Sequence, residues 1–262
     1  MKTGIFYWFG YRSPLAERFR MIASAGFDNV LLWWGDQFSE DDGPAAERAD
    51  LARKTGLYVE NIHTDFENAN SFWTDNQTGL AVFDRYMKNV DDCRTHEIPA
   101  MVVHLSSGDE MPQPPDNLGL DRVKRLAEKA ERNNVIIAIE NMRITGPLDF
   151  VFRNVDSPNL KLCYDSGHEN CLKTKHDILD NYGHRLAALH LHDNDGLTDQ
   201  HTIPGEGNIN WQLLINKLKK CNFAGSITLE ADNNFPEKYK SYTAEQFLQS
   251  AYAEAKKIAD QF

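Results

Sequence analysis

The chain has 262 residues, a length at which a single α/β barrel is common. Hydrophobic residues make up 41% of it and charged residues 26%, which is ordinary for a globular protein and excludes a disordered or fibrous chain. The net charge of −11 at pH 7 argues against a broad, non-specific nucleic-acid-binding surface, since such a surface is basic.

The sequence shows neither a membrane segment nor a disulfide framework. No apolar run approaches the roughly 18 residues that a membrane span needs. Tyr11 and Arg12 interrupt the apolar stretch near the start before a secretory signal could form. The four cysteines have no C-x-x-C spacing and no close pairing, so we expect reduced thiols. We therefore expect a cytoplasmic protein with no membrane partner, and the oligomeric state stays open, homo-oligomers included.

Eight short β-rich segments recur along the chain, with amphipathic helical segments between them. The predicted strands are residues 3–8, 29–34, 57–63, 100–105, 135–141, 160–165, 186–192 and 225–231. The clearest helices are predicted at 14–26, 44–56, 121–134 and 211–222. Strands that alternate with helices indicate right-handed βαβ units and a parallel sheet. Eight units, about thirty residues apart, predict a (β/α)8 TIM barrel in which residues 1–262 form one domain.

Polar or ionisable residues end most of the predicted strands. These residues are His63, His104, Glu140, Asp165, His192 and Glu230. Alternate residues share a strand face, so three series are predicted to face one side: Ile136–Ala138–Glu140, Ala188–His190–His192 and Leu57–Val59–Asn61–His63. Each series becomes polar toward its carboxyl end, which is where the loops of such a barrel assemble an active site.

The segment from Leu189 to Gly207 holds three histidines, three aspartates and one glutamate, and no lysine or arginine. One such residue alone is ordinarily a cap or surface group, and His190 alone would be a core histidine. Crowded acids, however, cost free energy unless a cation lies among them. The correlated pattern therefore predicts a divalent metal at the barrel mouth. Mixed carboxylate and imidazole donors favour Zn²⁺ or Mn²⁺.

Other common catalytic devices lack their motifs in this chain. G-x-S-x-G is absent, which argues against acyl transfer by a serine nucleophile. Neither G-x-G-x-x-G nor G-x-x-x-x-G-K-[ST] occurs, so the usual dinucleotide and nucleotide loops are excluded. The P-G-E-G at 204–207 is predicted to be a tight turn that closes the seventh βα loop.

Five short motifs are more specific than the strand pattern: A-I-E-N at 138–141, Y-D-S-G-H at 164–168, H-L-H-D-N-D at 190–195, D-Q-H at 199–201 and T-L-E-A at 228–231. Together they resemble the xylose-isomerase-like TIM barrels, which include sugar isomerases, ketose 3-epimerases, hydroxypyruvate isomerase, inosose dehydratase and endonuclease IV. The resemblance covers essentially the whole chain. It implies that a shared catalytic metal is bound by Glu140, Asp165, His192 and Glu230, with His168 beside it.

The ligand types also resemble those of the endonuclease IV branch. That resemblance implies additional metal ligands at His63, His104, His168, Asp199 and His201, and a total of one to three ions. Two hallmarks of the branch are missing, because the opening segment reads FYWFGYRSP and no basic loops for a DNA backbone are evident. The extra ligands therefore leave the function open.

Charge separates the two functions. The predicted mouth loops 64–77, 105–118 and 193–209 carry three, three and four acids and no lysine or arginine. Ten acids would repel a polyanion. Aromatic walls suited to the C–H faces of a sugar are expected from Phe6, Trp8, Trp33, Trp34, Phe66, Phe72 and Trp73. We expect a small, neutral carbohydrate substrate and no nucleic acid.

The expected reaction is isomerisation or epimerisation of a small keto- or aldo-sugar through an enediolate. The metal would act as a Lewis acid, with Glu140 and Glu230 as general base and acid. The expected substrate-binding residues are His168, His190, Arg143, Trp8 and Trp33. The alternative is a multinuclear zinc phosphodiesterase of the endonuclease IV type. A silent sugar-binding barrel is disfavoured because all the acid–base positions are filled.

Overall fold

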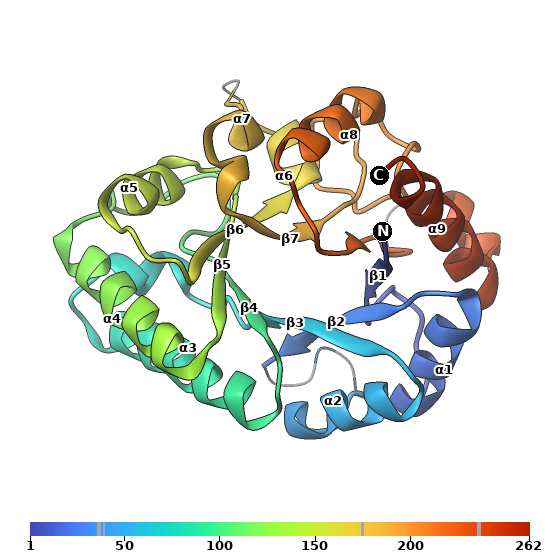
Figure 1. The fold of residues 1–262 in the computed structure, drawn as a ribbon, viewed down its shortest axis with the longest axis horizontal. Coiled ribbons are helices and arrows are strands. Elements are labelled where there is room, and N and C mark those ends of the chain that lie inside the picture. The colour runs from blue at the N-terminus through green and yellow to red at the C-terminus, as the bar shows by residue number, and fades with distance from the viewer. Residues whose placement is uncertain (36–37, 39, 174–175, 235–236) are drawn as a thin grey trace.

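Eight parallel strands form a ring in the computed structural model, which describes residues 1–35, 38, 40–173, 176–234 and 237–262 (Figure 1). The strands are β1 (Thr3–Phe6), β2 (Asn29–Trp34), β3 (Tyr58–Thr64), β4 (Ala100–Val103), β5 (Ile136–Glu140), β6 (Leu160–Asp165), β7 (Leu186–His190) and β8 (Ile227–Leu229). Their order is β7-β6-β5-β4-β3-β2-β1-β8. A parallel bridge between Leu191 and Leu229 joins the two outer strands and closes the ring. The predicted (β/α)8 barrel is confirmed.

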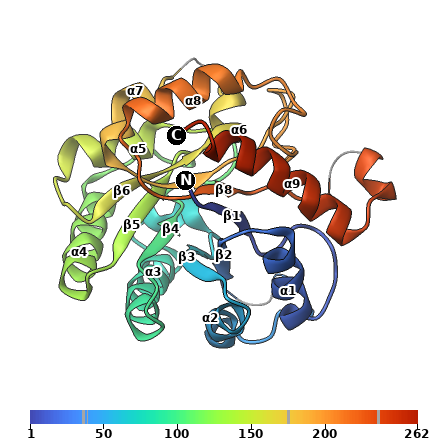
Figure 2. The same cartoon turned by 45° about the vertical axis from the view of Figure 1, so that its right-hand side comes forward.

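Helices surround the ring of strands, and α9 lies across β1, β8 and α1 (Figures 1 and 2). The helices are α1 (Leu15–Ala25), α2 (Ala45–Lys54), α3 (Gln77–Thr95), α4 (Asn117–Asn133), α5 (Gly146–Asn154), α6 (Ser166–Asn170), α7 (Ile178–Tyr182), α8 (Trp211–Lys220) and α9 (Ala244–Ala259). Three short 3-10 helices are η1 (Ala69–Trp73), η2 (Gly183–Arg185) and η3 (Glu237–Ser241). None of these described helices is both long and apolar enough to cross a bilayer.

The helix ends follow their capping residues. Helix α1 ends where predicted, because Gly26 adopts a left-handed φ of 109° and its N–H donates to the Ala23 carbonyl. Helix α4 begins before the predicted residue 121, because the Asp116 carboxylate accepts from Gly119 N at 3.0 Å and caps an earlier turn. The hydrogen-bonding side chain just before α4 therefore sets the start of this helix.

A bulge in β3 changes one predicted strand face. Val30 pairs with Val59 and the next residue, Leu31, pairs with Asn61, which leaves Glu60 as the extra residue. One inserted residue reverses the alternation of faces. The prediction that Leu57 and Val59 share a face with Asn61 and His63 is therefore wrong, although His63 still reaches the barrel mouth.

Small side chains fill the barrel beneath the carboxyl ends of the strands. Val102, Ala138, Cys163 and Ala188 form a buried cluster of their own, separate from the larger core between strands and helices. Ala138, Cys163 and Ala188 each lie two residues before an ionisable residue on the same strand, so the polar side chains stand on an apolar floor. All four cysteines, which lie within the described ranges, are free thiols.

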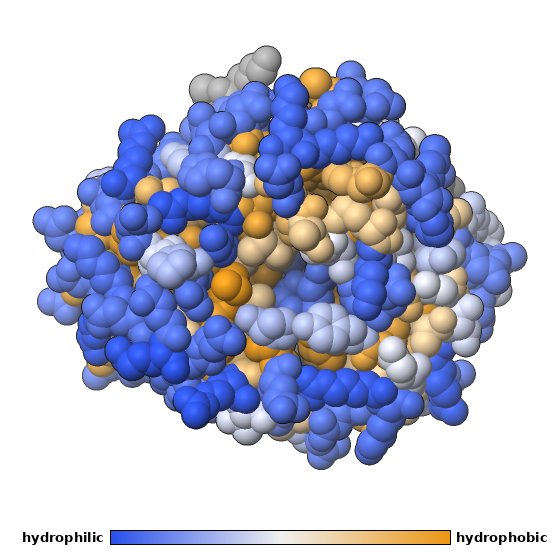
Figure 3. Space-filling model, in the orientation of Figure 1, coloured by the Kyte–Doolittle hydropathy of each residue, from blue (hydrophilic) through white to orange (hydrophobic). Residues whose placement is uncertain are grey.

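The centre of the face shown in Figure 3 is hollowed. Apolar residues gather around this hollow, whereas hydrophilic residues cover the surrounding helices. This face carries the two chain termini and lies at the amino ends of the strands, and the outer helices around it face water.

Gly119→Ala tests the packing of α4 on η1. A Cβ at this position would lie 2.1 Å from Cε3 of Trp73, a fully buried indole whose N–H donates to the Leu105 carbonyl at 2.6 Å. We expect overpacking to lower the free energy of unfolding by about 1–3 kcal/mol. Gly146→Ala is the control, because no described atom lies within 4 Å of its Cβ position. Urea denaturation compares the two, and equal losses would contradict the packing described here.

Candidate metal centre

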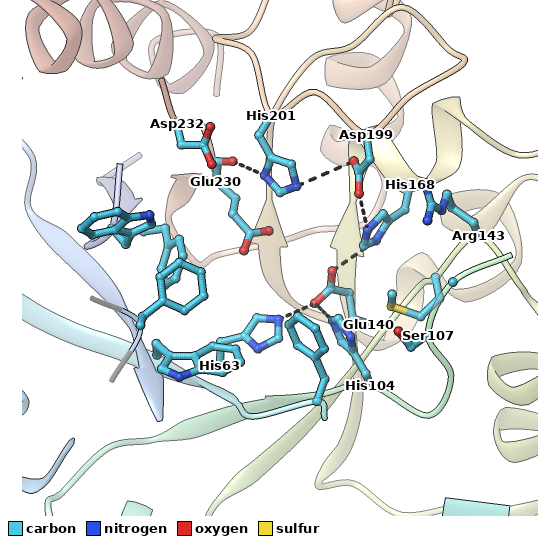
Figure 4. A pocket seen from close by; sticks show the side chains of 17 residues that line it. His63, His104, Ser107, Glu140, Arg143, His168, Asp199, His201, Glu230 and Asp232 are labelled. Carbon is cyan, nitrogen blue, oxygen red and sulfur yellow. Dashed lines mark hydrogen bonds and ion pairs between the residues drawn. The ribbon is translucent and has the colours of Figure 1, made fainter. Parts of the chain in front are cut away.

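A cavity of about 280 Å³ lies among the loops at the carboxyl ends of the strands (Figure 4). One wall is ionisable and is made of His63, His104, Glu140, Arg143, His168, Asp199, His201, Glu230 and Asp232. The other wall is aromatic and is made of Phe6, Trp8, Trp33, Phe38 and Phe66. Small-molecule sites typically have volumes of about 300–1,000 Å³, so this cavity suits a small ligand.

Glu140, the last residue of β5, is the centre of the ionisable wall and is only 2% exposed. Its Oε2 lies 3.3 Å from His63 Nε2, 3.1 Å from His104 Nε2 and 3.1 Å from His190 Nδ1. Its Oε1 lies 3.2 Å from His168 Nδ1. One carboxylate thus contacts imidazoles on β3 and β7, one that directly follows β4, and one on α6.

Four residues at the ends of four consecutive strands come together as a ligand set. Each of Glu140, Asp165, His190 and Glu230 offers one ligand atom, and these atoms all lie within 4.8 Å of one another. His190 Nδ1 is 3.1 Å from both Glu140 Oε2 and Glu230 Oε2. Three carboxylates collected in a buried place cost free energy unless a cation compensates them. The donor set therefore fits a divalent ion, and its mixture of oxygen and nitrogen suits Zn²⁺ or Mn²⁺.

The structure places His190, rather than His192, in this set. The register pairs Asp165 with His190 across β6 and β7, so these two side chains lie at the same level of the barrel. Successive residues on one face of a strand are about 6.6 Å apart, which puts His192 one level further out. The resemblance implied His192 as the metal ligand, and the expected reaction placed His190 on the substrate.

His192 belongs to a second group, with Asp199 and His201, whose ligand atoms also lie within 4.8 Å of one another. Its Nε2 is 3.2 Å from Asp165 Oδ1 and 3.6 Å from Asp199 Oδ1. The rings of His192 and His201 stack, with centroids 4.0 Å apart and planes 5° from parallel. His168 Nε2 reaches Asp199 Oδ2 from the other side at 3.1 Å.

A third group consists of His63, His104 and Glu140. The Phe66 ring stacks on His104 at 4.6 Å, and the Trp33 ring stacks on His63 at 5.6 Å. His63 Nδ1 lies 2.9 Å from the carbonyl of Thr64, which directs its Nε2 toward Glu140. A hydrogen bond on one ring nitrogen that fixes the other is the usual support of a metal-binding histidine.

The Y-D-S-G-H motif at 164–168 caps the start of α6 and allows the backbone to approach His192 closely. The Asp165 carboxylate accepts from His168 N at 2.6 Å and so starts α6. The Asn141 amide links β5 to β6, donating to the Asp165 carbonyl at 2.9 Å and accepting from Asp165 N at 2.8 Å. Gly167 is required because a Cβ there would lie 1.9 Å from Cε1 of His192. This segment therefore places two ionisable side chains at fixed points of the cavity.

Two of the three aspartates after β7 build the loop and do not line the cavity. Asp193 accepts from Gly205 N at 2.9 Å, Ile209 N at 3.1 Å and Trp211 Nε1 at 2.6 Å. Asp195 accepts from the backbone of Leu197 and Thr198, within its own turn. The acid content of this segment therefore overstated the number of ligands, because only Asp199 lines the cavity. The P-G-E-G segment forms the predicted turn, with Gly205 at a φ of 87°.

Opposite charges set the protonation of the cluster. Burial would raise the pKa of Glu140, but the imidazoles of His190 and His104 hold it well below its ordinary value. Burial would likewise raise the pKa of Glu230, yet His190 lowers it to about 2. Burial disfavours the charged form of His201, but Asp199 and Glu230 raise its pKa to about 10. Burial also opposes the charge on His168, whose pKa Asp165 and Asp199 raise well above the ordinary value.

The aromatic wall differs partly from the predicted one. Phe6, Trp8, Trp33 and Phe66 line the cavity as expected. Trp34 faces away, since alternate strand residues point to opposite sides, and its indole donates to Asp92 at 3.0 Å. Phe72 and Trp73 are buried in the core instead. Phe38 was missed, because it lies in the loop after β2 and follows no strand periodicity.

Arg143 and Arg12, two arginines that follow strands in the sequence, lie in different places relative to the cavity. Arg143 lines the cavity and is the only lysine or arginine among the described residues that do so. Arg12 is absent from the described lining, and its side chain is 68% exposed with Nη1 3.3 Å from Glu40. The cavity therefore has little fixed positive charge of its own.

Comparisons with known proteins agree with this geometry. The profile of a family described as xylose isomerase-like TIM barrel matches residues 19–250. The chain is 33% identical over 122 residues to an uncharacterized protein, MJ1311, of Methanocaldococcus jannaschii, covering 42% of each chain. It is 30% identical over 104 residues to an uncharacterized protein, y4fM, of Sinorhizobium fredii, covering 37% of this chain and 33% of that one. The matches thus span less than half the length of these relatives.

Several solved structures resemble the whole chain. A D-psicose 3-epimerase from Clostridium cellulolyticum has a TM-score of 0.79 at 16% identity and covers 99% of both chains. An IolI protein with a bound zinc atom has a TM-score of 0.79 at 18% identity and covers 100% of this chain and 99% of its own. A D-tagatose 3-epimerase-like protein has a TM-score of 0.73 at 19% identity. At these identities the likeness shows the shared fold.

Metal affinity should rise with pH, because a metal-bound imidazole must first lose its proton. His201 has its pKa raised from 6.5 to about 10, and those of His168 and His190 are also raised. We expect zinc affinity to increase from pH 6.5 toward pH 10, with protons released on binding. In the metal-free protein, the contribution of protonated His201 to the free energy of unfolding is fully present below pH 6.5 and is lost as the pH rises toward 10. Calorimetry in two buffers measures the release, and a pH-independent affinity would contradict it.

Proposed function

Since this chain belongs to the xylose isomerase-like TIM barrel family, we propose that it is a metal-dependent isomerase or epimerase of a small keto- or aldo-sugar. One observation carries the proposal: Glu140 and Glu230 both lie 3.1 Å from His190 Nδ1, at the base of a cavity with an aromatic wall. Sugar 3-epimerases among the structures of the same fold support it. We place the protein in the cytoplasm, because its cysteines are unpaired.

We assign the primary ion to Glu140, Asp165, His190 and Glu230. Zn²⁺ or Mn²⁺ bound there supplies Lewis acidity for a substrate carbonyl and its neighbouring hydroxyl. Two further places for ions are His63 with His104 and Glu140, and Asp199 with His201 and either His168 or His192. The proposed total is therefore one to three ions.

Glu140 and Glu230 carry the proton in the proposed reaction. Both have lowered pKa values, so either is ionised at neutral pH and able to remove a proton from the carbon beside a carbonyl. The C–H electron pair moves into the adjoining carbon–oxygen system. Return of the proton to the neighbouring carbonyl carbon, with transfer of the hydroxyl proton to the former carbonyl oxygen, gives isomerisation. Delivery to the original carbon from the opposite carboxylate, after that group has taken a proton from solvent, gives epimerisation.

The remaining walls bind the sugar. His168 lines the cavity with its ring nitrogens against Glu140 and Asp199, and a substrate oxygen that binds it shares its Nε2–H with Asp199. Trp8 and Trp33 present apolar faces to the C–H groups of the sugar. His190 is fully buried and absent from the described cavity lining, so its predicted contact with substrate is replaced by the role of a metal ligand.

The ligand groups also support a second candidate, a multinuclear zinc phosphodiesterase. His63, His104, Asp199 and His201 gather around the primary set, as a site for several ions requires. The charge of the cavity disfavours this candidate, because Arg143 is the only lysine or arginine among the described lining residues. Phosphate groups are ordinarily held by several such cations. We therefore propose the sugar reaction first.

His190→Ala and His192→Ala separate the two assignments of the primary ion. We expect His190→Ala to lose about one equivalent of metal and about 10²-fold in metal affinity or activity. His192→Ala should keep the primary ion. His176→Ala, which removes a histidine paired with Asp149 at 3.3 Å, is the control. Elemental analysis without chelator gives the counts, and loss of the primary ion in His192→Ala alone would return the assignment to His192.

Glu140→Gln and Glu230→Gln test the proton transfer. We expect each to lower turnover by about 10²–10⁴-fold and to stop deuterium incorporation from D2O into a panel of ketoses and aldoses. Glu245→Gln, at an exposed position of α9, should leave incorporation unchanged. Nicking of abasic DNA at low salt is measured beside it. Nicking without deuterium incorporation would favour the phosphodiesterase and contradict the proposal.

A further inference from the structure

Arg143 lies where two cavities meet. It lines the main cavity, and it also lines a side cavity of about 180 Å³ together with Asp109, Thr145, Cys171, Leu172, Lys173 and His176. Figure 4 shows His168 between Glu140 and Arg143, and Glu230 on the far side of Glu140. A sugar whose reacting carbons lie between the two glutamates would therefore extend past His168 toward Arg143.

Asp109 neutralises this arginine from outside the main cavity. Its Oδ1 lies 3.1 Å from Arg143 Nε, and the two side chains are 52% and 29% exposed. Asp109 lines the side cavity and is absent from the described lining of the main one. It follows β4, five residues after His104, whereas Arg143 follows β5, three residues after Glu140. Two neighbouring βα loops thus supply the two charges of the pair.

The ion pair with Asp109 compensates the charge of Arg143 but leaves some of its N–H donors available to a ligand. Among the described residues, the two terminal amino groups of Arg143 have no hydrogen-bond or ion-pair partner. Of the other ionisable residues of the side cavity, His176 is paired with Asp149 at 3.3 Å, and Lys173 is exposed, so that solvent screens its charge. The junction therefore offers a fork of N–H donors on an arginine whose charge Asp109 compensates.

We propose that the Asp109–Arg143 pair selects a substrate whose end distant from the reacting carbons is uncharged and carries hydroxyl groups. This inference rests on the proposed sugar reaction. A carboxylate or phosphate matches an arginine fork well, but here it would approach the carboxylate of Asp109 as well. A hydroxyl or carbonyl oxygen accepts the same N–H groups without that repulsion. Selectivity thus comes from repulsion of the wrong ligand as much as from attraction of the right one.

The test compares ribitol with D-ribonate, which has the same number of carbons and one carboxylate. Binding of each to the zinc-loaded protein is measured by calorimetry at low ionic strength, where exposed charges are least screened. We expect the wild type to bind ribitol more tightly. Asp109→Asn should tighten ribonate binding by about three- to tenfold, as removal of one partly exposed charge allows, and should change ribitol binding by less than about twofold.

Two further variants make the result specific. Glu110→Gln removes a neighbouring exposed acid that has no pairing with Arg143, so it should leave both affinities within about twofold. Asp109→Asn combined with Arg143→Gln should lose the gain for ribonate. Equal gains in ribonate affinity in Asp109→Asn and Glu110→Gln would overturn the proposal, and so would a gain that survives the loss of Arg143. It is also overturned if the wild type binds ribonate more tightly than ribitol, if Asp109→Asn weakens ribitol binding, or if neither probe binds.

These binding measurements need no turnover, so they test the selectivity of the Asp109–Arg143 pair separately from the proposed reaction. If the affinities are as expected but no sugar incorporates deuterium, the proposed selectivity of the Asp109–Arg143 pair is supported and the proposed isomerase is overturned. If a sugar incorporates deuterium but the ribonate affinity of Asp109→Asn is unchanged, the proposed reaction is supported and the proposed selectivity is overturned.

Discussion

The structure depends on one electrostatic constraint, the gathering of the largely buried carboxylates of Glu140, Asp165 and Glu230 in the barrel interior. Such a cluster is tolerated only with compensating positive charge. Protonated imidazoles supply part of this positive charge, because the nearby carboxylates raise the pKa values of His168 and His201. A dication supplies it more completely, and the surrounding donors are those that Zn²⁺ and Mn²⁺ take. The same constraint thus connects charge, protonation and chemistry.

The barrel meets this constraint through register and packing. Ala138, Cys163 and Ala188 leave room beneath the ionisable residues, and the pairing of Asp165 with His190 sets their common level. The loop after β7 then brings Asp199 and His201 over the mouth. Asp193 holds that loop by accepting from three donors far along the chain, so acids near the site divide between structure and ligation. Rigid strands carry the inner ligands and loops carry the outer ones.

Strand spacing and polar strand ends were sufficient to predict the barrel and the cavity residues His63, His104, Glu140 and Glu230, because both follow from a period of two and from parallel topology. The motif resemblance, not the spacing, indicated His168, Asp199 and His201. Three features could not be predicted this way. The bulge at Glu60 shifts a face without a change in composition. The choice between His190 and His192 depends on the register against β6. Phe38 and Asp109 lie in loops, where no periodicity indicates which way a side chain points.

The most direct test of the central claim is anomalous scattering from crystals of the chelator-free protein, recorded at the zinc and manganese edges. The account predicts an ion bound together by Glu140, Asp165, His190 and Glu230, because within the described part of the chain this is the group in which three carboxylates converge on one imidazole. Further peaks beside His63 and His104, or beside Asp199 and His201, would set the number of ions. An empty primary site, in crystals whose ions lie only in the outer groups, would contradict the account.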